Sequence, residues 1–148
     1  MSEWANGGRV AVGRLWSGGA ATAVIAALIA VVGIFLARGL FDVPVLAPEG
    51  AGVWGDADTV TYALWCALAA LAATGLLHLL LVTTPRPLRF FGWIVTLATL
   101  AAAAAPFVVD DSTASQIATA IINLTVGAAI GMLLTEVAVK AVGVRRPV

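Results

Sequence analysis

Few side chains in the apolar parts of this sequence can take part in chemistry. His78 and Glu136 lie within or at the edge of long apolar runs, as do Tyr62 and Cys66. Ionisable groups in such surroundings are costly and usually mark function. A polar pair formed by His78 and Glu136, or by Glu136 and Arg14, could relay protons or hold a cation. The alternative, which we favour, is that both side chains snorkel to an interface or form a structural hydrogen bond.

Motifs that would indicate an enzyme are missing from the sequence. It contains no HExxH metal motif, no GxSxG nucleophile elbow, no P-loop and no intramembrane aspartate pair. With one histidine and one cysteine, the chain lacks the ligands of a metal site and of an internal disulfide. Its eight basic and eight acidic residues cancel, so no basic field attracts nucleic acid. We therefore expect no enzymatic activity, no cofactor, no metal and no nucleic-acid partner.

The composition indicates that hydrocarbon surrounds most of the chain. Of 148 residues, 61% are hydrophobic and 11% are charged, and the mean hydropathy is +1.04. These values lie outside the range of soluble domains, so the lipid bilayer is the first partner to expect. Charged residues are absent from windows 15–37, 59–85, 90–109 and 112–135. These windows predict transmembrane helices at about 15–37, 59–82, 90–109 and 115–139. At about 1.5 Å per residue, the shortest reaches about 30 Å, which matches the hydrocarbon thickness.

Helices are preferred to strands because these windows are rich in alanine and leucine and show no alternation. We predict an all-α fold, in which residues 15–142 form an up-and-down four-helix transmembrane bundle. Residues 1–14 form an N-terminal segment, and residues 143–148 form a tail. Cleavage of the first span as a signal peptide is the alternative, which its length disfavours.

Basic residues alternate between connectors and predict the orientation. The basic segments are the N-terminal segment, the second connector and the C-terminal part made of the end of the fourth helix and the tail. They hold Arg9, Arg14, Arg86, Arg89, Lys140, Arg145 and Arg146. The first and third connectors together hold Arg38 as their one basic residue. The positive-inside rule therefore predicts a multi-pass protein of the cell membrane with both termini in the cytoplasm, an N-in/C-in topology.

Residues at the predicted helix ends fit this arrangement. Asp58 precedes the second helix, and Ser112 or Ser115 could cap the fourth. Pro85 and Pro87 prevent the second and third helices from continuing into each other. We expect a short, stiff turn between them.

The fourth predicted helix carries a stripe of small residues. Gly127 and Gly131 form a GxxxG spacing, and Asn123 lies on the same stripe one turn earlier. Glycines four residues apart let another helix approach closely, and Asn123 could hydrogen-bond across the contact. Glu136 lies on roughly the opposite face. Both faces are suited to helix packing, and the sequence leaves open which one packs within the bundle and which against a second copy.

The first connector, residues 38–58, is too long for a simple turn. Its first half is apolar, and its glycines allow tight turns. We expect the apolar half to tuck against the bundle. It is either a lid over a binding site or, as we prefer, a structural cap.

Two stretches carry a resemblance to a known family. PVLAPEG at 44–50 and TPRPLRFFGWI at 84–94 follow the first and second spans. With these motifs the chain resembles an uncharacterised family of small actinobacterial membrane proteins with a domain of unknown function. The resemblance covers about residues 14–142 and implies a four-helix membrane protein. It implies no activity and no site residues.

Two hypotheses of function remain at this point. In the first, the protein is a non-enzymatic membrane component that packs with itself, as a homo-oligomer, or with a larger membrane partner. In the second, it is a small transporter or proton-coupled channel that uses His78 and Glu136. A dry, closely packed bundle would favour the first, and a water-filled cavity reaching those residues would favour the second.

Overall fold

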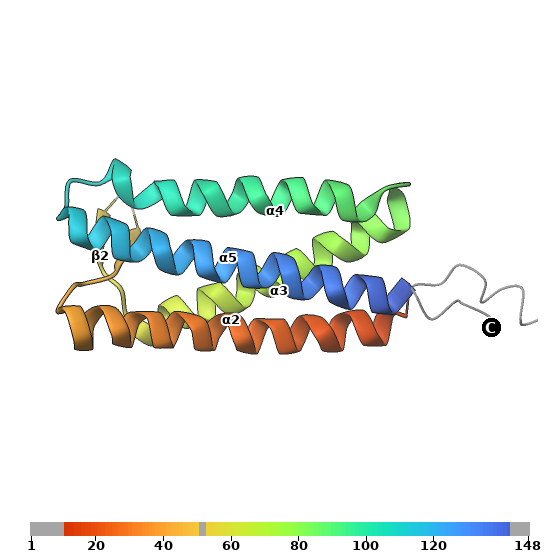
Figure 1. The fold of residues 1–148 in the computed structure, drawn as a ribbon, viewed down its shortest axis with the longest axis horizontal. Helices are drawn as coiled ribbons and strands as arrows, with labels where there is room; N and C mark the ends of the chain where they lie inside the picture. The colour runs from red at the N-terminus through yellow and green to blue at the C-terminus, as the bar shows by residue number, and fades with distance from the viewer. Residues whose placement is uncertain (1–10, 51–52, 143–148) are drawn as a thin grey trace, which may run out of the picture.

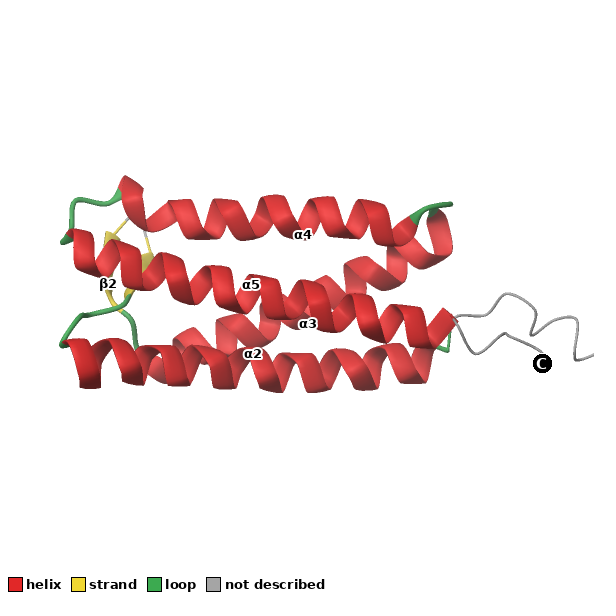
Figure 2. Ribbon diagram, in the orientation of Figure 1, coloured by secondary structure: helices red, strands yellow, loops and turns green. Residues whose placement is uncertain are grey.

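The chain folds as a bundle of long antiparallel helices (Figures 1 and 2). The computed structural model describes residues 11–50 and 53–142, so Arg9, Arg145 and Arg146 lie outside the described residues. The helices are α2 (Val12–Phe41), α3 (Thr59–Thr83), α4 (Pro87–Ala104) and α5 (Thr113–Val142). A 3₁₀ turn, η1 (Ala105–Val108), extends α4. All 4 helices are long and apolar enough to cross a membrane, which confirms the predicted four-helix transmembrane bundle.

The first helix extends beyond its predicted bounds of 15–37. It continues through Arg38 to Phe41. The charge of Arg38 does not end the helix, because its side chain forms an ion pair with Asp56. Asp42 then adopts a left-handed conformation with φ of 52°, and its N–H bonds to the carbonyl of Ala37. This is the usual αL ending of a helix, here without a glycine.

The other helix ends follow their local sequence. Asp58 caps α3 by accepting a hydrogen bond from the Thr61 N–H at 2.9 Å. Ser112 caps α5, because its hydroxyl accepts from the Ser115 N–H at 3.2 Å. Pro87 is the first residue of α4, a position where its missing N–H costs nothing. The third helix therefore starts three residues before the predicted 90, and the tight turn between α3 and α4 is confirmed.

A two-stranded antiparallel hairpin lies in the first connector. It consists of β1 (Leu46–Gly50) and β2 (Val53–Asp56), with Leu46 opposite Asp56. Val45, Leu46 and Ala57 are buried, and the Leu46 N–H donates to the Thr119 hydroxyl of α5 at 2.9 Å. These contacts fit a structural cap. We did not predict the strands, because a short segment rich in proline and glycine has no alternating pattern.

The helices pack in a ring. α2 packs against α3 on one side and α5 on the other, and α4 packs against α5 and, less extensively, α3 (Figure 1). Leu15, Ile34, Leu77, Phe91 and Leu134 are fully buried between them. Many large apolar side chains face outward from every helix. Such an apolar outer surface is expected where lipid, and not water, surrounds the bundle.

Charge separates between the two ends of the bundle. The start of α2, the α3–α4 turn and the end of α5 meet at one end, with Arg14, Arg86, Arg89 and Lys140 (Figure 1). We call this the basic end. The hairpin end carries Arg38 and the acidic residues Asp42, Asp56, Asp58, Asp110 and Asp111. The described chain therefore begins and ends on the same side of the bundle.

Candidate functional site

His78 is engaged by a tryptophan of the neighbouring helix. The Trp16 indole N–H of α2 donates a hydrogen bond to His78 Nδ1 on α3 at 3.2 Å. The two rings meet edge to face, with centroids 6.3 Å apart and an interplanar angle of 77°. An Nδ1 that accepts a hydrogen bond carries no proton, so Nδ1 is the acceptor nitrogen of the ring in this contact. Sequence reasoning did not link these residues, which are 62 positions apart.

Glu136 makes neither an ion pair nor a hydrogen bond with His78 in the described structure. It is exposed on α5, and the ion pair found in the described part of the chain joins Arg38 and Asp56 instead. Glu136 thus has no ion pair with His78 or with Arg14 in the described structure. The physical reason for His78 is its hydrogen bond with Trp16, because the polar edge of the ring faces α2 and not α5.

Asn123 joins three helices. Its Nδ2 donates to the Ala102 carbonyl of α4 at 2.8 Å, and its Oδ1 accepts from the Tyr62 hydroxyl of α3. Asn123 itself belongs to α5, so one side chain links α3, α4 and α5. A hydrogen bond between helices has no competing water in hydrocarbon, and such bonds fix the rotation of each helix.

The glycine stripe of α5 packs within the bundle. A Cβ on Gly127 would overlap the Thr99 side chain of α4. A Cβ on Gly131 would lie 3.2 Å from Val95 Cγ1, one turn along the same helix. Of the two arrangements that the sequence left open, the structure therefore has this stripe inside the bundle, against α4. Glu136, on the other face, stays exposed.

Further glycines of α2 make close contacts that the sequence motif did not reveal. A Cβ on Gly19 would overlap Thr74 of α3, and one on Gly33 would lie 2.8 Å from Ile122 Cγ1 of α5. These glycines do not form a GxxxG pair with each other. The sequence contains one signal for such contacts, which is a glycine within an apolar span. Glycine weakens a helix, and the close approach of another helix is a reason for its presence there.

Arg38 fastens the hairpin end. Its guanidinium forms an ion pair with Asp56 at 2.6 Å, donates to the Thr59 hydroxyl at 3.2 Å, and also donates to the Ala57 carbonyl. One side chain of α2 thus holds the end of β2 and the start of α3. The cap residue Asp58 adjoins this cluster. Hydrogen bonds from the Thr61 N–H and hydroxyl hold its pKa below the ordinary value of 3.8, with a smaller contribution from Arg38.

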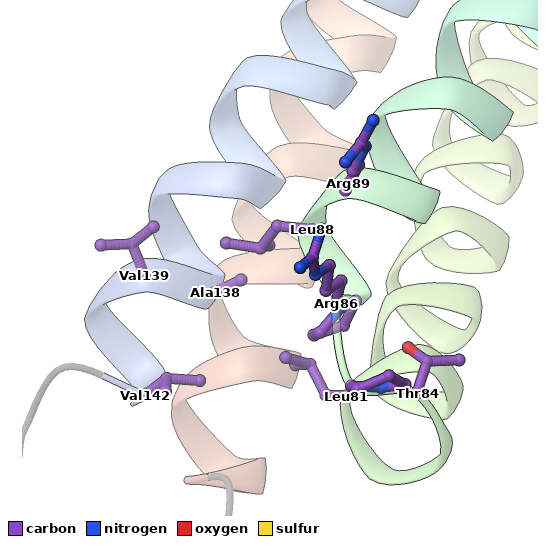
Figure 3. Close-up of a pocket in the computed structure, with 10 residues that line it drawn as sticks. Leu81, Thr84, Arg86, Leu88, Arg89, Ala138, Val139 and Val142 are labelled. Atoms are coloured by element: carbon purple, nitrogen blue, oxygen red, sulfur yellow. The ribbon is translucent and has the colours of Figure 1, made fainter.

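Two grooves open between the helices. The first, the basic groove, has a volume of about 760 Å³ and lies between the α3–α4 turn and the end of α5 (Figure 3). Its lining includes Arg86 and Arg89 and the apolar side chains Leu81, Leu88, Val139 and Val142. The second, of about 470 Å³, lies between α2 and α5 at the hairpin end and has only apolar side chains. Neither groove is lined by His78 or Glu136.

A metal site would need several acidic, histidine or cysteine side chains close together. Within residues 11–50 and 53–142, no three of them lie close enough together to hold a metal ion.

Comparisons with known proteins place the chain in a family. A model of a family of unknown function, DUF6069, matches residues 10–140. No curated protein and no solved structure was found to match. The family match confirms the resemblance drawn from residues 44–50 and 84–94 to an uncharacterised family, and it carries no information on the source organisms.

Proposed function

The chain belongs to the DUF6069 family of unknown function, and we propose that it is a non-enzymatic membrane component that packs with itself or with a larger membrane partner. It would reside in the cell membrane with both termini in the cytoplasm, as the basic end predicts. The observation that carries the proposal is that the polar groups inside the bundle are occupied by contacts between or within its own helices.

The buried hydroxyl groups illustrate this use of polar atoms. Thr22, Thr74 and Thr119 each donate to the carbonyl four residues earlier in their own helix, at 2.8 Å. Among the described residues, the one buried side-chain polar atom without a partner is Arg38 Nε, at the hairpin end. A path for ions or protons needs a series of polar groups that can exchange partners. The satisfied groups in this bundle support a packing role instead.

The close helix contacts support the same role. Gly19, Gly33 and Gly127 bring neighbouring helices together until no side chain fits between them. Such contacts leave no room for a water-filled path at these positions. His78, the residue on which a transport role would depend, is held by Trp16 and lines neither groove. Because no observation favours transport, we propose no second function.

A flux measurement tests the part of the proposal that excludes transport. The purified chain is reconstituted into vesicles that contain a pH-sensitive dye, and a potassium gradient with valinomycin drives proton entry. We expect the flux to equal that of protein-free vesicles. Asp111→Asn, which removes an exposed acid at the hairpin end, is the control for Glu136→Gln. A proton flux that Glu136→Gln abolishes and Asp111→Asn retains would overturn the proposal.

An association measurement tests the remaining part. The chain is isolated from its own membrane in a mild detergent, and native mass spectrometry gives the mass and stoichiometry of the particle. We expect a homo-oligomer of the 15.0 kDa chain or a complex with a partner in fixed ratio. A monomer without a stoichiometric partner, both in detergent and in lipid nanodiscs, would contradict the proposed role.

A further inference from the structure

We propose that the basic groove binds an anionic phospholipid, with the lipid phosphate held by Arg86 and Arg89 and an acyl chain lying along the apolar lining. Figure 3 shows Leu88 extending from the start of α4 toward α5, above Ala138, and Arg86 at the start of α4. The inference goes beyond the packing role, because it assigns a ligand to a site that packing does not require.

The groove lies at the ends of the spans, where lipid headgroups are expected. It is formed where α3 ends, α4 begins and α5 ends, at the basic end of the spans. Val139 and Val142 of α5 are about half exposed, at 54% and 53%, so the groove opens toward the surrounding lipid. A lipid can therefore enter from the side and keep its headgroup at the interface while its chain stays in hydrocarbon.

The arginines of the groove carry positive charge without a partner in the described structure. Both side chains are exposed, and no described carboxylate lies within 4.0 Å of either one. At the basic end, the one described acid is Glu136, which does not line the groove. Both arginines line the groove, and the planar donor fork of arginine pairs with phosphate oxygens.

The start of α4 adds further donors for an anion. Its N-cap residue, Arg86, makes no side-chain hydrogen bond to the helix, and Pro87 has no N–H. The backbone N–H groups of the first helical turn therefore have no side-chain cap, and the positive end of the helix dipole lies at this end of α4. The helix end supplements the two arginines, which lie on its N-cap and in its first turn.

The apolar lining distinguishes a lipid from a free phosphate ion. Leu81, Leu88, Val139 and Val142 offer hydrocarbon contact that an inorganic ion does not use. A volume of about 760 Å³ also exceeds what one phosphate group fills and lies in the range of sites for larger ligands. Basic pockets between helices at the membrane surface suit anionic lipid headgroups for the same reasons.

Lipid retention in native mass spectrometry tests the proposal on the full chain. The protein is incorporated into nanodiscs that contain equal amounts of phosphatidylglycerol and phosphatidylcholine, and the lipids retained after release are counted. We expect one phosphatidylglycerol to be retained in preference to phosphatidylcholine. In the double variant Arg86→Gln/Arg89→Gln, retention should fall on the order of tenfold to thirtyfold, because two cations near the phosphate are lost.

A matched double variant separates the groove from general charge. Arg14→Gln/Lys140→Gln removes two positive charges from the same end but leaves the lining of the groove unchanged. It should retain phosphatidylglycerol as the wild type does. Equal loss in both double variants would show attraction by charge alone and overturn the site. Unchanged retention in Arg86→Gln/Arg89→Gln would overturn it too.

A steric variant and a competitor test whether the ligand is a lipid. Val139→Trp fills the groove without changing charge, and Val24→Trp places the same ring on the lipid-facing side of α2, where Val24 is 61% exposed. Retention should fall in Val139→Trp and persist in Val24→Trp. If Val139→Trp has no effect and millimolar inorganic phosphate displaces the lipid, the site binds phosphate and the proposal fails. Circular dichroism of each variant verifies that it remains folded.

Discussion

Gly127→Ala is the substitution whose cost follows most directly from the helix packing. A Cβ added there would meet three atoms of Thr99 on α4, of which Thr99 Cβ would be 2.8 Å away. Ordinary carbon contacts are about 3.5–4.0 Å, so α4 and α5 must separate by about 1 Å. Thr99 is short and branched at Cβ, so it cannot swing aside as a long side chain would. Overpacking of this kind costs about 1–3 kcal/mol.

Two other glycines supply graded controls for this measurement. A Cβ on Gly131 would be 3.2 Å from Val95 Cγ1, so Gly131→Ala needs only a small shift and should cost less than about 1 kcal/mol. A Cβ on Gly92 would meet nothing within 4 Å. Gly92→Ala should leave stability unchanged or raise it by up to about 1 kcal/mol, because alanine favours helix.

Unfolding in mixed micelles measures these differences. The fraction of sodium dodecyl sulfate is increased, and far-UV circular dichroism and tryptophan fluorescence give the free energy of unfolding. A loss of about 2 kcal/mol corresponds to roughly a thirtyfold change in the folding equilibrium. Thr99→Gly should restore stability to Gly127→Ala, because it removes the atoms that clash. If Gly127→Ala were as stable as Gly92→Ala, the close contact of α4 and α5 would be refuted.

The remaining predictions concern the cap and the polar links. Because the pKa of Asp58 is lowered in the folded state, its cap stabilises the fold above about pH 4, and this stability is lost as the pH falls through the folded pKa. Asp58→Asn should therefore remove this part of the pH dependence of unfolding. A pH dependence identical to wild type would contradict it. In the micelle assay, Asn123→Ala should lower the free energy of unfolding by about 1.2 kcal/mol, because it removes two hydrogen bonds. Tyr62→Phe removes one of them and should lower it by about 0.6 kcal/mol. Equal costs would contradict the bridge. Nitrogen-15 spectra should show His78 Nδ1 as an unprotonated hydrogen-bond acceptor, and Trp16→Phe should change the Nδ1 signal because the donor is lost. An Nδ1–H signal in the wild type would exclude the hydrogen bond.

The spans could be predicted from the sequence because charged residues are costly in hydrocarbon, so a long window without them indicates a span. Windows without charged residues located all 4 helices that the structure contains. The exact ends of the helices were harder to predict. Arg38 was assigned to the connector, whereas the helix continues past it, because its side chain finds Asp56, Thr59 and Ala57 beyond the helix end. That partner set exists only after the hairpin has folded.

Partners of polar side chains were harder to predict than helices. The depth of His78 and Glu136 in the membrane can be counted along the chain, but the direction of each side chain depends on how its helix is rotated in the bundle. That rotation is set by contacts such as Gly19 against Thr74, which no local spacing specifies. The stripe of Asn123, Gly127 and Gly131 was recognised as a packing face, while its partner, α4, came from the structure alone.

The proposed role depends on how the chain crosses the membrane. Reporter fusions measure this topology directly. A reporter that is active only in the cytoplasm and one that is active only outside are fused in turn to each terminus and within residues 38–58. We expect cytoplasmic activity at both termini and external activity at the first connector. Termini on opposite sides of the membrane, or a first connector on the same side as both termini, would contradict it.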